Sequence, residues 1–239
     1  LQINGRPQWK SIRGGSRVYV RRLCQDIEAN GGRVLLNTPV LSVTRHVDGV
    51  RIETSKGVEV FDQVIMACHT DQSLALLSDA HPQELAVLAA VRYQPNTAYL
   101  HTDERLMPVR KKAWSAWNYY AGAVQNGKFP VAVTYWLNRL QPLPFDRAVM
   151  VTLNPPEPPR TNDTIAVINY AHPLLDTAAY QAQQALPSIQ GLDRVYFAGA
   201  WAGYGFHEDG LKSGLAVANL LGVFAPWQVA QGSKQEQSA

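Results

Sequence analysis

Three observations predict a mixed α/β fold with α+β character, built from two regions. Helical and extended patterns follow each other over residues 16–90 and resume after residue 176. The short runs 64–67 and 194–198 are apolar without alternation, which is typical of strands covered on both faces of a central sheet. Residues 97–170 change to a succession of extended segments. This change of period marks the second region.

Composition bounds the class of protein before any motif is considered. The 239 residues are 46% hydrophobic and 17% charged, which is the range of a folded globular chain. The net charge of +3 is too small to indicate a nucleic-acid partner, and none is predicted. Cys24 and Cys68 lie far apart without a C-x-x-C spacing, which favours a reducing, cytoplasmic location. Because the chain begins at Leu1 without a secretory signal, we expect its true start to lie upstream.

The first region begins with a helix. Apolar residues at helical spacing predict it over 16–29, with Ser16 as its cap and Gly31-Gly32 at its end. Hairpin signals at Asp48-Gly49 and Lys56-Gly57 then predict an antiparallel meander. Its β-branched runs are 33–36, 40–45, 50–54 and 58–61. After the apolar run 64–67, two further helices are expected, at 70–77 and 82–90.

The second region is rich in aromatic residues. Extended segments are predicted at 97–102, 113–120, 130–137, 149–153 and 165–170, with a hairpin tip at Asn126-Gly127 and an exposed proline-rich connection at 155–159. Alternating aromatic side chains either pack one face of this sheet or form the floor of an apolar pocket. The chain closes with a helix at 176–186, a strand at 194–198, a helix at 209–221 and a polar, flexible tail at 226–239.

The strongest chemical feature is the glycine-rich turn between the last strand and the closing helix. It contains Gly199, Gly203 and Gly205, and the helix opens near Gly210. Glycines allow backbone N–H groups to approach a ligand, and a helix N-terminus favours an anionic or electron-rich group. The alternative is an ordinary strand-to-helix turn. A dinucleotide fingerprint would need a third glycine where Glu208 stands, so the turn is not a primary phosphate loop.

These residues resemble a known superfamily in three ordered motifs. The motifs are Arg13-Gly-Gly-Ser16 before a helix, Leu36-Asn-Thr-Pro-Val40 with a meander ending in Val64-Ile-Met-Ala67, and Phe197-Ala-Gly199 continuing to Gly214. Together they resemble the C-terminal half of the FAD-dependent amine oxidase and phytoene desaturase superfamily. The segments 114–119, 133–138, 151–155 and 203–210 resemble, more narrowly, the predicted NAD/FAD-binding proteins encoded beside cyclopropane fatty-acid synthase genes.

The resemblance implies an FAD cofactor and names its contacts. The residues matching cofactor-binding positions are Val40, Gly199, Ala200, Trp201, Gly210, Leu211 and Ser213. Of these, Val40 matches a backbone contact to adenine, and Gly210 with Leu211 match the helix start below the flavin pyrimidine ring. Relatives commonly carry an acid shortly after Phe-Ala-Gly, where this chain has Ala200 and Trp201. That departure affects the ribityl contact.

The resemblance also implies a division into domains. Residues 1–90 and 190–225 match the later part of an FAD/NAD(P)-binding Rossmann-like domain, and 91–189 match a mixed β-sheet substrate domain. The family's opening G-x-G-x-x-G unit and ribose-binding acid are not found in this sequence. We therefore expect the chain to be a fragment that binds FAD poorly and is inactive by itself.

Other candidate groups are weaker. His207, adjacent to Glu208 and Asp209, is the best candidate for a catalytic acid or base, since histidine titrates near neutral pH. Equally, Asp209 could simply cap the closing helix. Adjacent residues do not converge, so no metal site is predicted. A basic segment from Arg6 to Arg22 predicts peripheral membrane contact or a solvated helix face.

The predicted function is hydride removal to FAD from a small, apolar, lipid or fatty-acyl substrate. This expectation rests on the aromatic sheet and on the resemblance. Two alternatives stay open: a non-catalytic module that binds an apolar ligand or lipid, and an amine oxidase acting on a small amine. The sequence gives no oligomeric state.

Overall fold

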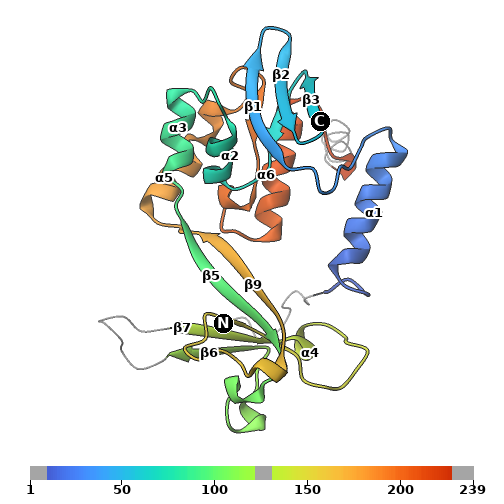
Figure 1. The fold of residues 1–239 in the computed structure, drawn as a ribbon, viewed down its shortest axis with the longest axis vertical. Helices are drawn as coiled ribbons and strands as arrows, with labels where there is room; N and C mark the ends of the chain where they lie inside the picture. The colour runs from blue at the N-terminus through green and yellow to red at the C-terminus, as the bar shows by residue number, and fades with distance from the viewer. Residues whose placement is uncertain (1–9, 122–130, 228–239) are drawn as a thin grey trace, which may run out of the picture. The chain divides into compact units, whose positions relative to one another are not determined.

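The computed structural model describes residues 10–121 and 131–227, which form two compact units (Figure 1). The two-sheet unit comprises residues 36–94 and 172–239, and the five-stranded unit comprises residues 1–35 and 95–171. These boundaries place 172–189 in the two-sheet unit and 1–35 in the other, which differs from the division expected from sequence. The α/β fold class is confirmed.

The first helix has the bounds that its periodicity predicts. Helix α1 spans Ser16–Ala29. Gly31 has a φ of 83°, and the N–H of Gly32 donates to the carbonyl of Ile27 over 2.9 Å, closing a Schellman turn. The predicted cap is wrong: Gly15 occupies the N-cap position, and Ser16 is the first helical residue. Arg6 of the basic segment lies outside the described residues.

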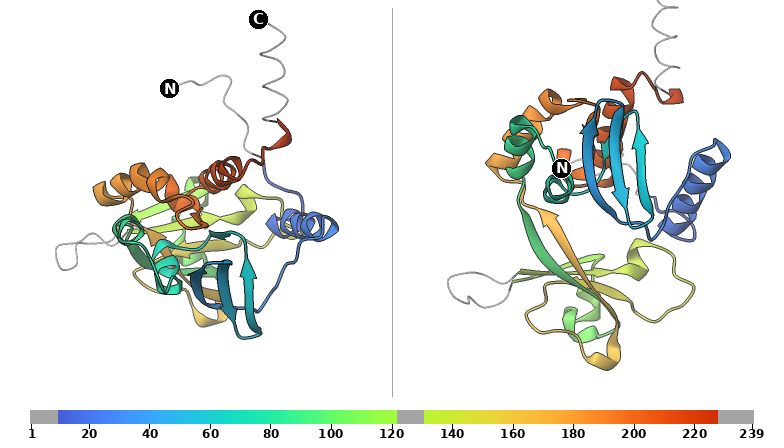
Figure 2. Two further views of the ribbon diagram at one scale, coloured as in Figure 1. Left: turned by 90° about the horizontal axis from the view of Figure 1, so that it is seen from above. Right: turned by 45° about the horizontal axis from the view of Figure 1, so that its top comes forward.

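The meander is a three-stranded antiparallel sheet of β1 (Val40–His46), β2 (Gly49–Thr54) and β3 (Gly57–Phe61), shown side by side in Figure 2. The fourth predicted run, 33–36, is not a strand. Asn37 has a φ of 53°, and the Thr38 hydroxyl donates to the Leu36 carbonyl. This local turn separates 33–36 from β1 and prevents strand pairing.

The two apolar runs form a parallel pair, β4 (Val64–Met66) and β10 (Val195–Phe197). Helices α2 (Thr70–Leu76), α3 (Pro82–Ala89) and α5 (Thr177–Ala185) lie together beside β1 (Figure 1). Buried residues from these elements share one core that includes Leu88, Ala182 and Phe197. Because α5 contributes Ala179 and Ala182 to this core, residues 172–189 belong to the two-sheet unit.

The second region is a five-stranded sheet in the order β6-β7-β8-β5-β9. Its strands are β5 (Tyr93–His101), β6 (Trp117–Ala121), β7 (Val131–Trp136), β8 (Met150–Leu153) and β9 (Thr164–Pro173). The predicted strand 113–120 begins too early, because a 3-10 turn, η2 (Lys111–Ala113), precedes β6. The hairpin tip at Asn126-Gly127 and most of the 226–239 tail lie outside the described residues.

The two faces of this sheet differ. On one face, Asn118, Thr134 and Thr152 are register neighbours across β6, β7 and β8. On the other, Trp117 contacts Tyr135 edge-to-face with ring centroids 5.5 Å apart. Aromatic residues lie on both faces, because Tyr120 and Trp136 share the face of Asn118 and Thr134. Both interpretations of the aromatic residues therefore stay open.

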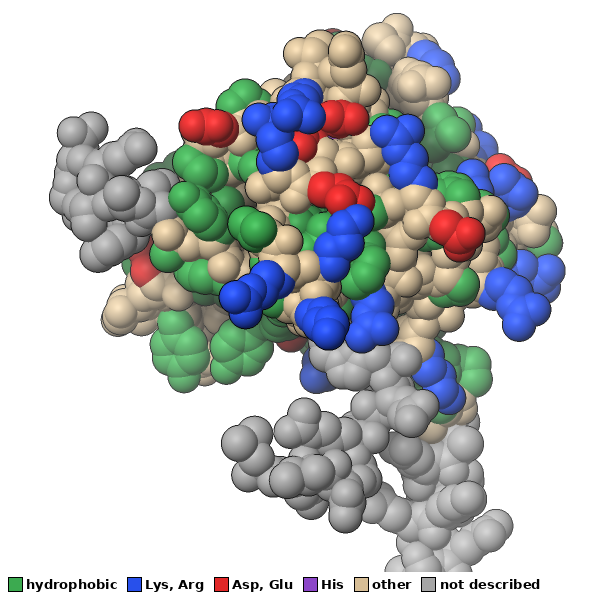
Figure 3. All heavy atoms as spheres, turned by 90° about the horizontal axis from the view of Figure 1, so that it is seen from below, with side chains coloured by type: hydrophobic (Ala, Val, Ile, Leu, Met, Phe, Trp, Pro, Cys, Tyr) green, Lys and Arg blue, Asp and Glu red, His purple; other side chains and the backbone are tan. Residues whose placement is uncertain are grey.

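The surface mixes side-chain types. Figure 3 shows basic, acidic and hydrophobic side chains interspersed on one face. Among the described residues, no helix combines the length and apolarity needed to cross a bilayer.

Candidate functional site

The parallel pair of strands creates the site. The carboxyl ends of β4 and β10 lie at the same edge, because Met66 pairs with Phe197 and the N–H of Ala198 donates to the Met66 carbonyl. The chain leaves β10 through the glycine-rich turn and enters α6 (His207–Leu220), while β4 leads to the start of α2. In open α/β sheets, this strand edge next to helix N-termini is where ligands bind.

Two glycines of the turn are required by its internal packing. A Cβ at Gly199 would lie 2.6 Å from the Trp201 indole, and one at Gly203 would lie 2.6 Å from the Asp209 carboxylate. A third, Gly205, has a φ of 87°. Glycine at these positions therefore has a structural reason, with or without a ligand.

The turn brings several predicted cofactor-binding residues together. The N–H of Gly199 donates to the Ser213 hydroxyl over 3.0 Å, which joins the end of β10 to the second turn of α6. Gly210 faces Ala200, since a Cβ there would be 3.8 Å from the Ala200 nitrogen. Trp201 is buried in η5 (Ala200–Ala202). This cluster, from Gly199 to Trp201 with Gly210 and Ser213, is called the β10–α6 turn below.

The remaining predicted residues lie around this turn. Leu211 is half exposed on α6. His207 is exposed at the first position of α6. Val40 begins β1 and is partly buried against the common core. Their roles toward a cofactor stay predictions.

The start of α6 is capped from within. The carboxylate of Asp209 accepts the N–H of Phe206 over 3.0 Å, so Asp209 does cap the helix, from its third position. This is why the helix begins two residues before the predicted start. Glu208 lies exposed in the same turn, 3.7 Å from Lys212. Both carboxylates reduce the positive potential of this helix end.

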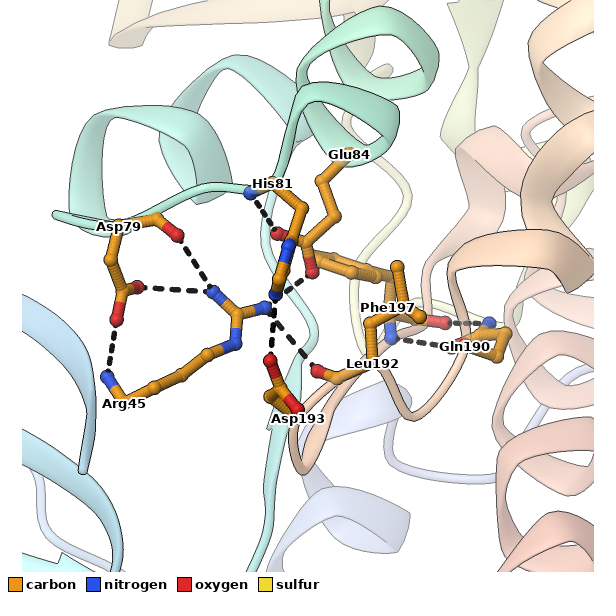
Figure 4. Close-up of polar contacts among 8 residues, drawn as sticks. All are labelled: Arg45, Asp79, His81, Glu84, Gln190, Leu192, Asp193 and Phe197. Atoms are coloured by element: carbon orange, nitrogen blue, oxygen red, sulfur yellow. Dashed lines mark hydrogen bonds and ion pairs between the residues drawn. The ribbon is translucent and has the colours of Figure 1, made fainter. Parts of the chain in front are cut away.

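Two glutamines hold the turn in place. The amide of Gln183 donates to the carbonyls of Trp201 and Gly203 over 2.9 and 2.8 Å. Gln190 brackets Phe197 by accepting its N–H and donating to its carbonyl (Figure 4). Sequence reasoning missed both residues. A polar residue between the buried Ala182 and Leu186 was the available signal for Gln183.

A buried ion network ties β1 to α3 and to the loop before β10 (Figure 4). Arg45 lies 2.5 Å from a fully buried Glu84 carboxylate and 3.0 Å from Asp79. It also donates to the carbonyl of Leu192 over 3.4 Å. Next to it, His81 and Asp193 are 2.9 Å apart. The network is a structural device, since its charged groups pair with one another, although the Nε of Arg45 is buried without a hydrogen-bond partner among the described residues.

A bound cofactor would satisfy one buried N–H group of the turn. The indole Nε1 of Trp201 is buried and has no hydrogen-bond partner among the described residues. A buried donor without an acceptor costs about 1–3 kcal/mol. Because this N–H lies beside Gly199, an oxygen acceptor of a ligand at the β10–α6 turn would satisfy it. FAD carries such acceptors in its diphosphate and ribityl groups, so the residues present fit part of a flavin site.

Comparison with known proteins places the chain in a family. Residues 1–135 match the model of the family described as flavin containing amine oxidoreductase. The β10–α6 turn lies outside that match. No curated protein sequence matches the chain significantly.

Solved structures share the fold. The chain is similar to a CLA-producing fatty acid isomerase from P. acnes, at 13% identity over 86% of this chain and 51% of that chain, with a TM-score of 0.60. It is also similar to cyclohexylamine oxidase from Brevibacterium oxydans IH-35A, at 14% identity, 87% and 53% coverage and a TM-score of 0.56. A double mutant of putrescine oxidase matches at 14% identity, 87% and 53% coverage, and 0.58.

The chain therefore spans about half the length of the solved structures it matches. The family match covers more than half of this chain, from the segment before α1 through β7. The predicted flavin cofactor is confirmed at the level of the family. The chain belongs to the flavin-containing amine oxidoreductase family.

Proposed function

We propose that the protein to which this chain belongs removes hydride from an apolar substrate of lipid or fatty-acyl type. The observation that carries this proposal is the β10–α6 turn, with its unpartnered Trp201 N–H beside the carboxyl ends of two parallel strands. When bound, the flavin supplies the hydride acceptor. The chain's own residues would hold and orient it: Trp201 through its indole N–H, and Gly210 with Leu211 from the second turn of α6.

His207 is the proposed acid or base. It is the first residue of α6, directly after the glycine-rich turn, and it is exposed. Histidine is the side chain suited to proton transfer near neutral pH. A His207→Gln variant should lower the rate of flavin reduction by substrate and retain flavin. An unchanged rate would remove His207 from the chemistry.

The surface of the five-stranded sheet and the similarity to one solved structure support the proposed substrate class. Aromatic side chains such as Trp117 and Tyr119 cover one face of the five-stranded sheet and are exposed. An apolar face of this kind suits an acyl chain better than a small polar substrate. The similarity in fold to a fatty acid isomerase, and the narrower resemblance to proteins encoded beside cyclopropane fatty-acid synthase genes, support the same class.

Two alternatives compete with this proposal. A small-amine oxidase is supported by the amine oxidoreductase family and by the fold shared with cyclohexylamine oxidase. A non-catalytic lipid-binding module is supported by the lack of a G-x-G-x-x-G sequence in this chain. Peripheral membrane contact through α1 is a further proposal, because Arg17, Arg21 and Arg22 accompany exposed apolar residues on that helix.

Anaerobic mixing separates these candidates. The product of the natural reading frame, loaded with FAD, is mixed without oxygen with oleate, with phosphatidylglycerol vesicles, or with cyclohexylamine. Bleaching of the flavin absorbance by oleate or by vesicles supports the lipid proposal. Bleaching by cyclohexylamine alone would replace it with an amine oxidase. Lipid binding without flavin would favour the non-catalytic module.

A further inference from the structure

The five-stranded unit contains a cavity that the flavin site does not use. Its volume is about 700 Å³, within the usual range of roughly 300–1,000 Å³ for small-molecule sites. Its floor is the polar face of the sheet, at Ala132, Thr134 and Thr152. One wall is the segment 105–109 and the other is 155–157. No residue of the β10–α6 turn is among those that line it.

A buried carboxylate joins the two walls. Asp103 is 2% exposed, and its carboxylate accepts the Arg105 guanidinium over 2.6 to 3.1 Å. It also accepts the backbone N–H groups of Arg105 and of Arg160, over 3.1 and 2.9 Å. One side chain thus fixes the end of the 155–160 connection against the 105–109 segment. The cavity is therefore built into the fold and is held open by a satisfied polar network.

The directions of the hydrogen bonds below the floor can be assigned. His101 is fully buried, and its Nδ1 accepts the N–H of Asp103 over 3.1 Å. Its proton must then be on Nε2, which donates to the Thr152 hydroxyl over 2.7 Å. The Thr152 hydroxyl donates in turn to Thr134 over 2.8 Å, and Thr134 donates to the carbonyl of Leu106 over 3.3 Å.

This order leaves the two threonines of the floor as acceptors only, while Tyr119 and Tyr120 also line the cavity. Each threonine oxygen keeps an unused lone pair, while both hydroxyl protons are engaged within the protein. Asn118 also lines the cavity, and its side-chain amide donates to the carbonyls of Ser115 and Thr134. The charged groups at the cavity are the Arg105 guanidinium, neutralised by Asp103, and the exposed Glu157 carboxylate. These three groups together carry one more negative charge than positive charge.

We infer that this cavity is a second binding site, for a small molecule with an apolar body and a head group that donates hydrogen bonds. An alcohol or an amine has such a head, and a carboxylate does not. The apolar body would pack against Met107, Pro108 and Pro155, and the head would donate to Thr134 or Thr152. The inference is independent of flavin binding, because every group it uses lies in the five-stranded unit.

Benzyl alcohol, benzylamine and benzoate test the head-group rule. Each is titrated into the full chain while the methyl NMR signals of Thr134 and Thr152 are followed. Benzyl alcohol and benzylamine should shift these signals, and benzoate should bind at least about tenfold more weakly. Stronger binding of benzoate would mean that Arg105 dictates the head group, and would overturn the inference. Absence of binding by all three would also overturn it.

Two pairs of variants locate the site. Ala132→Phe fills the cavity from its floor and should weaken binding of benzyl alcohol at least about tenfold, whereas Val133→Phe, on the other face of β7, should change it less than about twofold. Thr134→Val frees the Thr152 proton to donate, so the affinity for benzoate should rise relative to that for benzyl alcohol. Thr134→Ser should keep the wild-type order of the affinities for the three ligands. Equal effects within either pair would contradict the placement.

Discussion

Trp201 is the residue on which the proposed ligand contact of the β10–α6 turn depends. Its indole N–H is buried without an acceptor, although the ring itself is packed into the core. A second indole, that of Trp136 in the five-stranded sheet, is also buried without an acceptor and provides a matched control. The two residues allow a flavin contact to be separated from a general packing effect.

Trp201→Phe should weaken FAD binding about tenfold in the flavin-loaded protein, which corresponds to one lost hydrogen bond of about 1.4 kcal/mol. Trp136→Phe should leave FAD affinity unchanged. Isothermal titration with FAD measures both. Equal losses in the two variants would show that Trp201 does not contact the cofactor.

His101 gives the five-stranded unit a pH dependence. Burial lowers the pKa of His101 below its usual 6.5, although the charges of Asp103 and Asp163 oppose this shift. The unfolded chain then binds more protons than the folded one below pH 6.5, so stability is complete above 6.5 and falls as the pH drops toward the folded pKa. His101→Gln should weaken the dependence of the thermal unfolding midpoint on pH below 6.5. A wild-type slope in that variant would contradict the assignment.

Asp103 adds a further loss of stability at lower pH. The Arg105 guanidinium and two backbone N–H groups hold the pKa of its carboxyl well below the usual 3.8. Its contribution to stability is therefore present above pH 3.8 and is lost only as the pH falls further. Asp103→Asn should destabilise the protein at neutral pH and narrow the difference from wild type in strong acid.

Among the elements, β1 depends on a buried charge network, which can be compared with a separate, more exposed ion pair. Arg45→Met should cost about 3–5 kcal/mol, because it leaves the fully buried Glu84 carboxylate without a partner. The double variant with Glu84→Leu should recover most of that loss. Arg92→Met removes a more exposed pair with Asp176 and should cost at most about 1 kcal/mol. Urea unfolding checks all three, and equal costs for Arg45 and Arg92 would contradict the account.

The glycines of the last element differ in what they tolerate. Gly203→Ala would place a Cβ 2.6 Å from the Asp209 carboxylate and should break the cap of α6, whereas a Cβ at Gly214 meets nothing within 4 Å. Gly214→Ala should therefore stabilise the protein by about 0.5–1 kcal/mol, the helix preference of alanine over glycine. The midpoint temperature of thermal unfolding should fall for Gly203→Ala and rise for Gly214→Ala.

Local signals predicted most elements and long-range pairings explain the misses. Helix α1 follows its periodicity from Ser16 to Ala29, and the meander follows its two hairpin signals. Residues 33–36 have strand-forming composition, yet a turn at Asn37 leaves them without a partner. Glycine spacing located the β10–α6 turn. The residues that support the two sites, Arg45 and His101 among them, were missed because their partners lie far away in the sequence.

For the whole molecule, the two compact units carry different chemistry. The two-sheet unit holds the β10–α6 turn, and the five-stranded unit holds the aromatic-rich sheet and the cavity above Thr134 and Thr152. The chain covers about half of the flavoenzyme-like structures it matches. The flavin proposal therefore concerns the product of the natural reading frame.

The most direct test of the central claim is the absorbance of that product after purification. The protein is separated from free flavin by gel filtration, and its visible spectrum is recorded before and after acid release of the cofactor. The account predicts flavin bands that elute with the protein, and the release of FAD. A colourless protein that gains no such bands after incubation with FAD would contradict the account.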